Sequence, residues 1–176
     1  MPPHMEAARS VRVLQKKIAL LGAPGVGKTS LVRRFVTRLF DDTYLTTIGV
    51  KVDKKSLQVR GRELTLMIWD VAGTEEHFSI PPAYVRGAAG YLLVADGTRP
   101  ETLEAGLALV ESIPRELGPL PAVLVLNKAD LTDAWRLDDG AIARERGWSM
   151  PVLRASAKTG DGVEGAFATL ADTLLT

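Results

Sequence analysis

Residues 22–29 read Gly22-Ala23-Pro24-Gly25-Val26-Gly27-Lys28-Thr29, directly after the apolar run 18–21 and before a segment of helical periodicity at 29–39. A strand, a glycine-rich loop and a helix in this order form an anion site, because the backbone N–H groups of the loop turn inward and the helix contributes the positive end of its dipole. Lys28 can reach the β- and γ-phosphates of a polyphosphate, and the Thr29 hydroxyl can ligate Mg²⁺. This stretch therefore predicts a phosphate-binding loop.

A second motif, Asn127-Lys128-Ala129-Asp130, follows the short apolar run 123–126. At the carboxyl end of a parallel strand such a loop faces the crevice where α/β sheets bind ligands. Guanine presents two neighbouring donors that a carboxylate such as Asp130 accepts together, whereas adenine presents neither, and an unpaired buried carboxylate costs ~1–3 kcal/mol or more. Asn127 can join loop to loop, and the Lys128 stem can lie along the base. In the later segment 155–158, the Ala157 backbone N–H can serve the guanine O6.

A third motif lies at the end of the expected strand 63–69, where Asp70 is followed by Gly73. An acidic residue at a strand end beside a phosphate loop suits a water-mediated hold on Mg²⁺. Gly73 leaves its N–H free for a γ-phosphate and can follow a swing of the chain at little steric cost. Thr47 is a candidate second hydroxyl ligand for Mg²⁺, although threonine also often begins a strand.

Five motifs thus follow one another along the chain, at 22–29, 47–50, 69–73, 127–130 and 156–158. In this order they resemble the Ras superfamily of small GTPases, most closely its Rab-like branch, from Lys17 onward. The resemblance implies a guanine-nucleotide switch that slowly hydrolyses GTP, with GTP or GDP and Mg²⁺ bound and with mobile switch segments near 40–49 and 73–82. It also implies protein effectors, exchange factors and activating factors as partners.

The resemblance assigns roles to individual residues as well. Phe40 stands where the family has an aromatic side chain against the guanine, and Tyr44 where a tyrosine closes over the phosphates. The expected nucleotide contacts are Gly25, Val26, Gly27, Lys28, Thr29, Ser30, Phe40, Tyr44, Asn127, Lys128, Asp130, Ser156, Ala157 and Lys158. The expected Mg²⁺ ligands are Thr29, Thr47 and Asp70, and the expected catalytic residues are Lys28, Thr47, Gly73 and Thr74.

Three positions depart from the family pattern. Thr74 stands where the family usually has the glutamine that orients the attacking water. A threonine hydroxyl is shorter and lacks the separate donor and acceptor atoms of an amide, so it cannot hold water and γ-phosphate in the same way. Pro24 replaces a common glycine, and proline donates no N–H and fixes φ, so the loop is stiffer. Trp69 and Tyr84 match two members of a Rab aromatic triad that recognises effectors, but Val52 takes the third place.

Two other functions remain open. The chain could be a GTP-bound scaffold or adaptor with negligible unassisted hydrolysis, which Thr74 and Pro24 would favour. It could also be a kinase-like enzyme that uses ATP, an alternative that Asp130 argues against.

The composition fits one domain of ordinary globular character, with 176 residues of which 46% are hydrophobic. The net charge of +1 gives no whole-protein attraction to nucleic acid or to an anionic membrane. The absence of cysteine excludes disulfides, thiolate metal sites and a lipid on a cysteine. We therefore expect a cytoplasmic monomer without a direct lipid anchor and without a nucleic-acid partner. Frequent alanine and arginine suggest a bacterial source.

Strands and helices are expected to alternate along the chain. Strands are expected at 18–21, 50–59, 63–69, 91–95, 123–126 and 152–155, and helices at 29–39, 83–86, 101–112, 141–146 and 163–174. The turn chemistry at 60–62 favours a hairpin, which makes one edge strand antiparallel. The pattern predicts a three-layer α/β domain of the P-loop GTPase kind at 17–176, with a mostly parallel six-stranded sheet and one antiparallel edge strand, after a flexible arm at 1–16.

Overall fold

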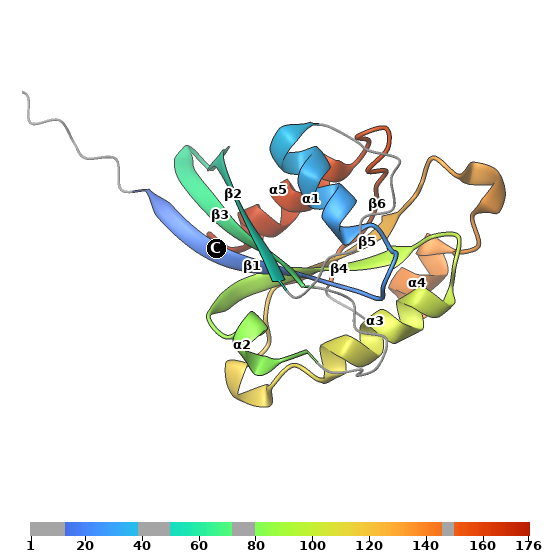
Figure 1. Ribbon diagram of the computed structural model, residues 1–176, viewed down its shortest axis with the longest axis horizontal. Coiled ribbons are helices and arrows are strands. Elements are labelled where there is room, and N and C mark those ends of the chain that lie inside the picture. Colours follow the sequence, from blue (N-terminus) through green and yellow to red (C-terminus); the bar gives the residue numbers. More distant parts are fainter. Residues whose placement is uncertain (1–12, 39–49, 72–79, 146–149) are drawn as a thin grey trace, which may run out of the picture.

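A computed structural model describes residues 13–38, 50–71, 80–145 and 150–176 of the chain. The described segments form one six-stranded sheet with helices on both faces (Figure 1). Strands and helices alternate in the order β1 (Leu14–Leu21), α1 (Lys28–Thr37), β2 (Val50–Val59), β3 (Arg62–Val71), α2 (Pro82–Val85), β4 (Ala88–Asp96), α3 (Glu101–Glu111), β5 (Ala122–Asn127), α4 (Asp139–Glu145), β6 (Val152–Arg154) and α5 (Val163–Thr173).

The strand order across the sheet is β2-β3-β1-β4-β5-β6. Neighbouring strands are parallel except β2, which runs antiparallel to β3 at the edge. The order reverses at β1, because β3 pairs with one of its sides and β4 with the other. Ligands of such sheets bind at the carboxyl ends of the strands beside this reversal. The predicted fold class is confirmed, including the single antiparallel edge strand.

The hairpin between β2 and β3 turns through Arg60 and Gly61, whose φ angles are 50° and 72°. Two successive positive φ angles are the signature of a type I′ turn, whose twist matches that of the flanking strands. The Arg60 guanidinium reaches across to α5, where Nε and Nη2 donate to the two carboxylate oxygens of Asp172 at 2.6 and 2.9 Å.

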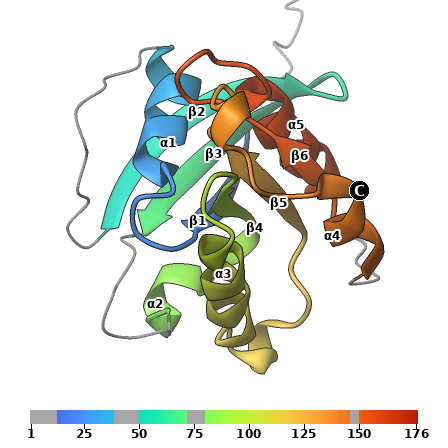
Figure 2. The ribbon, with the colours of Figure 1, turned by 90° about the vertical axis from the view of Figure 1, so that its right-hand side faces the viewer.

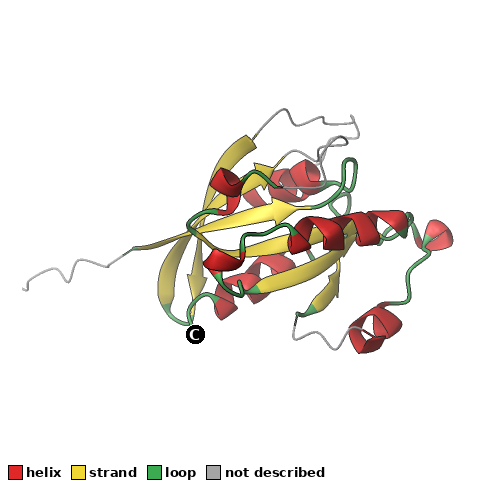
Figure 3. Cartoon of the chain, turned by 90° about the horizontal axis from the view of Figure 1, so that it is seen from below, coloured by secondary structure: helices red, strands yellow, loops and turns green. Residues whose placement is uncertain are grey.

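Each face of the sheet carries its own hydrophobic core. Along β1 the side chains alternate, so that Ile18 and Leu20 pack in the core beneath α1 and α5, while Ala19 and Leu21 pack in the core with α2 and α3. Figure 2 shows α1 and α5 above the strands and α2 and α3 below them. Figure 3 shows the sheet from the side of α2 and α3. Phe35 of α1 stacks on Phe167 of α5 with ring centroids 4.0 Å apart.

Several elements begin earlier than apolar periodicity predicts. β1 starts at Leu14 rather than at residue 18, because residues 14–17 pair with 64–67 of β3 although most of their side chains are polar. β4 starts at Ala88, together with the apolar run 88–95, rather than at residue 91. In β1, backbone pairing with a neighbour extends the strand, and side-chain hydrophobicity does not report it. Residues 14–16, assigned to the arm from the sequence, therefore lie in β1. No helix in the described part of the chain is long and apolar enough to cross a membrane.

Candidate functional site

The loop 22–27 connects the carboxyl end of β1 to α1 (Figure 2). Its glycines are required by close approach as well as by backbone conformation. Gly27 has φ 98°, and a Cβ there would lie 2.4 Å from the Asn127 Nδ2. A Cβ on Gly22 would lie 2.4 Å from the Val94 carbonyl oxygen. The loop can therefore follow this path only with glycine at these two positions.

Lys28 opens α1 and folds back over the loop. Its Nζ donates to the carbonyl oxygens of Gly22 and Ala23 at 2.9 and 3.1 Å, and the side chain is buried. Burial lowers the pKa of Lys28 to about 8, while the nearby Asp70 acts in the opposite direction. A buried ammonium with few anionic neighbours is stabilised by an anion that enters the loop.

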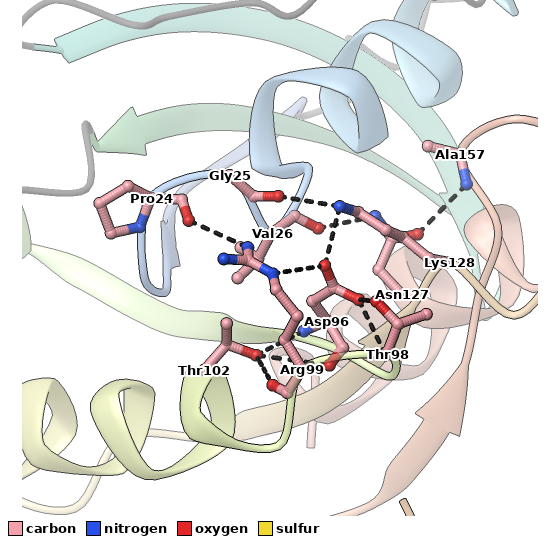
Figure 4. Close-up of polar contacts among 10 residues, drawn as sticks. All are labelled: Pro24, Gly25, Val26, Asp96, Thr98, Arg99, Thr102, Asn127, Lys128 and Ala157. Carbon is pink, nitrogen blue, oxygen red and sulfur yellow. Dashed lines mark hydrogen bonds and ion pairs between the residues drawn. The ribbon is translucent and has the colours of Figure 1, made fainter. Parts of the chain in front are cut away.

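Three further donors hold the outer carbonyls of the loop (Figure 4). The Asn127 Nδ2 donates to the Val26 carbonyl at 2.9 Å, and the Lys128 Nζ donates to the Gly25 carbonyl at 3.1 Å. The Arg99 Nη2 donates to the Pro24 carbonyl at 3.3 Å. Sequence reasoning did not identify Arg99, and the only available signal was its position three residues after Asp96, at the carboxyl end of β4.

Thr29 and Asp70 make the side of the site where a cation would bind. The Thr29 Oγ1 donates to the Asp70 Oδ2 at 2.5 Å. Asp70 is fully buried, and its Oδ1 has no hydrogen-bond partner among the described residues. Burial raises the pKa of Asp70, against the opposing hydrogen bond from Thr29 and the charge of Lys28. A buried oxygen without a partner, beside a hydroxyl, matches the oxygen ligands and ordered water that Mg²⁺ uses.

The loop after β5 is joined to the segment after β6. The buried Asn127 uses both ends of its amide, because its Oδ1 also accepts the N–H of Ala157 at 3.2 Å. The Ser156 Oγ donates to the Asp130 Oδ1 at 2.7 Å, and the Ala129 N–H donates to the Ala155 carbonyl at 3.0 Å. Two loops that the sequence separates by about thirty residues thus form one unit.

Asp96 at the end of β4 contacts both Arg99 and Lys128, whose side chains donate to the loop 22–27 (Figure 4). Its Oδ2 contacts the Lys128 Nζ at 2.8 Å and the Arg99 Nε at 3.0 Å, and its Oδ1 accepts the N–H and hydroxyl of Thr98 at 2.9 and 2.7 Å. Burial alone would raise the pKa of Asp96, but the hydrogen bonds from Lys128, Thr98 and Arg99 lower it to about 2. Asp96 is therefore a permanent anion at neutral pH.

The other predicted site residues fall into two groups. Ser30 lies in the first turn of α1, and Lys158 is exposed just after the segment that carries Ala157. The remaining ones lie outside the described residues, namely Phe40, Tyr44, Thr47, Gly73 and Thr74, as do most of the switch segments 40–49 and 73–82.

The residues aligned with the Rab aromatic triad are described. Val52 is 44% exposed and lies opposite Trp69 in the β2–β3 ladder. Trp69 and Tyr84 are half-buried, and the Lys17 Nζ lies 3.7 Å from the centroid of the Trp69 ring. One face of Trp69 is therefore in contact with a cation of the chain itself.

A glycine loop with a buried lysine, at the carboxyl ends of a doubly wound sheet, defines a P-loop nucleotide-binding domain. The model of the Ras family matches residues 17–176. The chain belongs to the Ras family.

Among its relatives are three Ras-related proteins. Rab-18 of Lymnaea stagnalis is 37% identical over 90% of this chain and 80% of the relative. Rab-18-B of Danio rerio is 38% identical over 90% of this chain and 78% of the relative. SEC4 of Saccharomyces cerevisiae is 37% identical over 88% of this chain and 73% of the relative. The predicted Rab-like small GTPase is confirmed, so the chain is a GTP-binding switch protein that hydrolyses GTP.

Proposed function

We propose that one nucleotide lies along the carboxyl ends of β1, β5 and β6, with its phosphates in the loop 22–29 and its guanine between 127–130 and 156–158. The observation that carries this proposal is the double use of Asn127. Its amide nitrogen donates to the Val26 carbonyl of the phosphate loop, and its oxygen accepts the Ala157 N–H of the third loop. A single buried side chain thus joins the three segments into one site.

The phosphate end would act through main-chain N–H groups and one ammonium. The N–H groups of Gly25, Val26 and Gly27 would donate to phosphate oxygens, together with the first N–H groups of α1 at Thr29 and Ser30. Lys28 would then place its Nζ between the β- and γ-phosphates. Because that ammonium is already buried and its pKa is lowered to about 8, a bound polyphosphate would raise the pKa and keep it charged at neutral pH.

Thr29 and Asp70 would hold Mg²⁺ against the phosphates, and Thr47 would add a second hydroxyl. The ion would neutralise charge on the β- and γ-phosphate oxygens. The Asp70 oxygen that has no partner among the described residues would then accept a hydrogen bond from a water on the ion. Asp70 is best suited to this role as a carboxylate, and a nearby cation would lower its raised pKa.

At the other end, Asp130 would accept the N1–H and the 2-amino group of guanine. The Ser156 hydroxyl already donates to one carboxylate oxygen at 2.7 Å, which fixes the orientation of the group. Lys128 would lie along the base with its stem, and a guanine O6 would share the Ala157 N–H with the Asn127 oxygen. Lys158, Phe40 and Tyr44 would complete the contacts that the family resemblance implies.

In the proposed reaction a water attacks the γ-phosphorus in line with the bond to the β–γ bridging oxygen. A new P–O bond forms, the bridging oxygen leaves with GDP, and a water proton ends on the released phosphate. Lys28 and the N–H groups of the loop stabilise the charge that develops, and the Gly73 N–H contacts the γ-phosphate. Thr74 cannot orient the water as an amide would, so we propose slow unassisted hydrolysis.

The segments 40–49 and 73–82 would be ordered through Thr47 and Gly73 while GTP is bound and released after hydrolysis. We propose that protein effectors, exchange factors and activating factors recognise these two states, and that the protein acts as a monomer in the cytoplasm. Val52 in place of an aromatic residue supports effectors different from those of typical Rab proteins. The adaptor alternative, with negligible hydrolysis, has only Thr74 and Pro24 in its favour.

The base assignment is tested by isothermal titration of GDP and ADP in the presence of Mg²⁺. We expect a strong preference for GDP, and Asp130→Asn should weaken GDP binding at least about 100-fold, because an amide cannot accept both guanine donors and leaves one unpaired. Asp133→Asn, an exposed neighbour on the same loop, serves as the control. Equal affinity for GDP and ADP, or unchanged GDP binding by Asp130→Asn, would refute the base assignment.

A further inference from the structure

We propose that Arg99 and Asp96 are positioning residues of the phosphate loop. In this proposal Asp96 holds Arg99 and Lys128 side by side, and these two cations fix the carbonyl groups of Pro24 and Gly25 so that the next N–H groups face the phosphates. The inference deepens the proposed function and rests on it. Neither residue touches the nucleotide in this assignment.

The carbonyl groups of the phosphate loop are all held by donors. Each of the six successive carbonyls from Gly22 to Gly27 accepts a hydrogen bond. The donors are the Lys28 side chain for the first two carbonyls, Arg99 for Pro24, Lys128 for Gly25, Asn127 for Val26, and the Leu31 N–H for Gly27. Such a complete set means that no peptide unit of the loop is free to rotate without losing a donor.

A donor that fixes a carbonyl group also fixes the N–H group of the same peptide unit. In a planar trans peptide the C=O of one residue and the N–H of the next point in opposite directions. A donor that holds the Pro24 carbonyl therefore also aims the Gly25 N–H, and a donor on the Gly25 carbonyl aims the Val26 N–H. These are two of the N–H groups assigned to the phosphates. Pro24 itself has no N–H, so the Gly25 N–H is the first that the loop can offer after Ala23.

Asp96 holds the two cations that donate to the loop. The same Oδ2 contacts the Lys128 Nζ at 2.8 Å and the Arg99 Nε at 3.0 Å. Since Arg99 uses Nε for Asp96 and Nη2 for the Pro24 carbonyl, its planar guanidinium bridges the two groups (Figure 4). The backbone of Arg99 is itself fixed, because its carbonyl accepts the Thr102 hydroxyl at 2.7 Å.

If Arg99 only stabilised the fold, its loss would lower the temperature of thermal unfolding. The Arg99 side chain is 42% exposed, and the buried Asp96 keeps its contacts with Lys128 and Thr98 when Arg99 is lost. Loss of Arg99 should therefore leave thermal unfolding nearly unchanged, yet release one peptide unit of the phosphate loop. The effect should fall on the diphosphate and not on the base, because Arg99 contacts the loop at Pro24, at the phosphate end of the site.

The test compares the release of GDP with that of inosine diphosphate, which lacks the 2-amino group that Asp130 would bind. For Arg99→Ala we expect both to dissociate about tenfold faster, the effect of one hydrogen bond from a charged donor at the low end of its range. The GDP-to-IDP affinity ratio should stay at the wild-type value. Arg115→Ala, which removes an exposed arginine after α3, should change neither rate.

Arg99→Lys should also release GDP and IDP nearly as fast as Arg99→Ala, because a single ammonium cannot bridge the Asp96 oxygen and the Pro24 carbonyl as the planar guanidinium does. If Arg99→Ala does not fold, Arg99→Lys carries the same comparison. GDP release within about twofold of wild type, or a changed GDP-to-IDP ratio, would overturn the inference. Failure of the wild-type protein to prefer GDP over ADP would instead overturn the proposed function.

Discussion

The two ends of the proposed nucleotide site are built from different chemical groups. The end proposed for the phosphates is one continuous segment, 22–29, that offers main-chain N–H groups and a single ammonium. The base end is assembled from two segments, 127–130 and 156–158, that offer side chains and are tied together by Asn127 and Ser156. Main-chain N–H groups select a ligand mainly by its charge, so the affinity of such a site depends on the groups that fix its peptide units. The selectivity of a site made of side chains depends on which side chains it presents.

This difference shows where each end is vulnerable. At the base end a substitution removes a recognising group directly. At the phosphate end it acts through donors that lie far away in the sequence, such as Arg99, which is separated from Pro24 by 75 positions. The two ends meet in Asn127 and in Asp96, and substitutions there should distinguish effects on one end from effects on both.

The largest effect is expected for Asn127→Ala. It would leave the Val26 carbonyl and the Ala157 N–H without their partner, and each such loss costs about 1–3 kcal/mol. We expect GDP affinity to fall at least about 100-fold and the free energy of unfolding to fall by about 2–4 kcal/mol. Titration calorimetry and urea unfolding measure the two quantities. A loss confined to guanine selectivity, with GDP and ADP equally weak but the protein fully stable, would contradict the joining role of Asn127.

A second effect concerns pH and Asp96, whose pKa in the folded protein is lowered to about 2. A carboxyl whose pKa falls on folding stabilises the protein above its unfolded pKa, and this stabilisation is lost as pH falls through the folded value. The lowering corresponds to about 2 kcal/mol. The difference in unfolding free energy between wild type and Asp96→Asn should therefore narrow by about 2 kcal/mol from about pH 5 to about pH 2.

Because of Asp70, the stability of wild type has to be compared with that of Asp96→Asn at each pH. Burial raises the pKa of Asp70, so its protonation favours the folded state as the pH falls, with a sign opposite to that of Asp96. The pH dependence of the unfolding free energy of the wild-type protein alone would combine the effects of Asp70 and Asp96. The difference between wild type and Asp96→Asn reports the effect of Asp96. If the difference in unfolding free energy between wild type and Asp96→Asn stays constant across this pH range, then Lys128 and Arg99 do not lower the pKa of Asp96.

How far the sequence predicts this site follows the same division. The loop 22–29 could be predicted because its residues are contiguous and its glycines, Lys28 and Thr29 have steric or chemical reasons to be there. Asp130 could be predicted from the two donors that guanine presents, and Asn127 from its place in the same motif. Arg99 could not, because its role arises only when the sheet order places the carboxyl end of β4 beside the loop after β1. The sequence also does not indicate which side chain will donate to a given main-chain carbonyl group.

The smallest effect is expected for Thr74→Gln. This change would add a side-chain amide to the phosphate end, for which we otherwise propose main-chain N–H groups, Lys28 and Mg²⁺. A glutamine amide can accept from the attacking water and donate toward the γ-phosphate at once, which a hydroxyl cannot do over the same reach. We expect single-turnover GTP hydrolysis to rise about tenfold, the effect of one hydrogen bond made in the transition state.

Thr74→Asn is the matched control, because it carries the same amide on a side chain one methylene shorter and should stay near the wild-type rate. GDP affinity and the GDP-to-IDP ratio should be the same in all three proteins, since the change concerns only the attacking water. An unchanged or lower rate for Thr74→Gln would mean that residue 74 does not contact the water. The slow hydrolysis that we propose would then be attributed to the stiffness that Pro24 gives to the loop, and Pro24→Gly would test this.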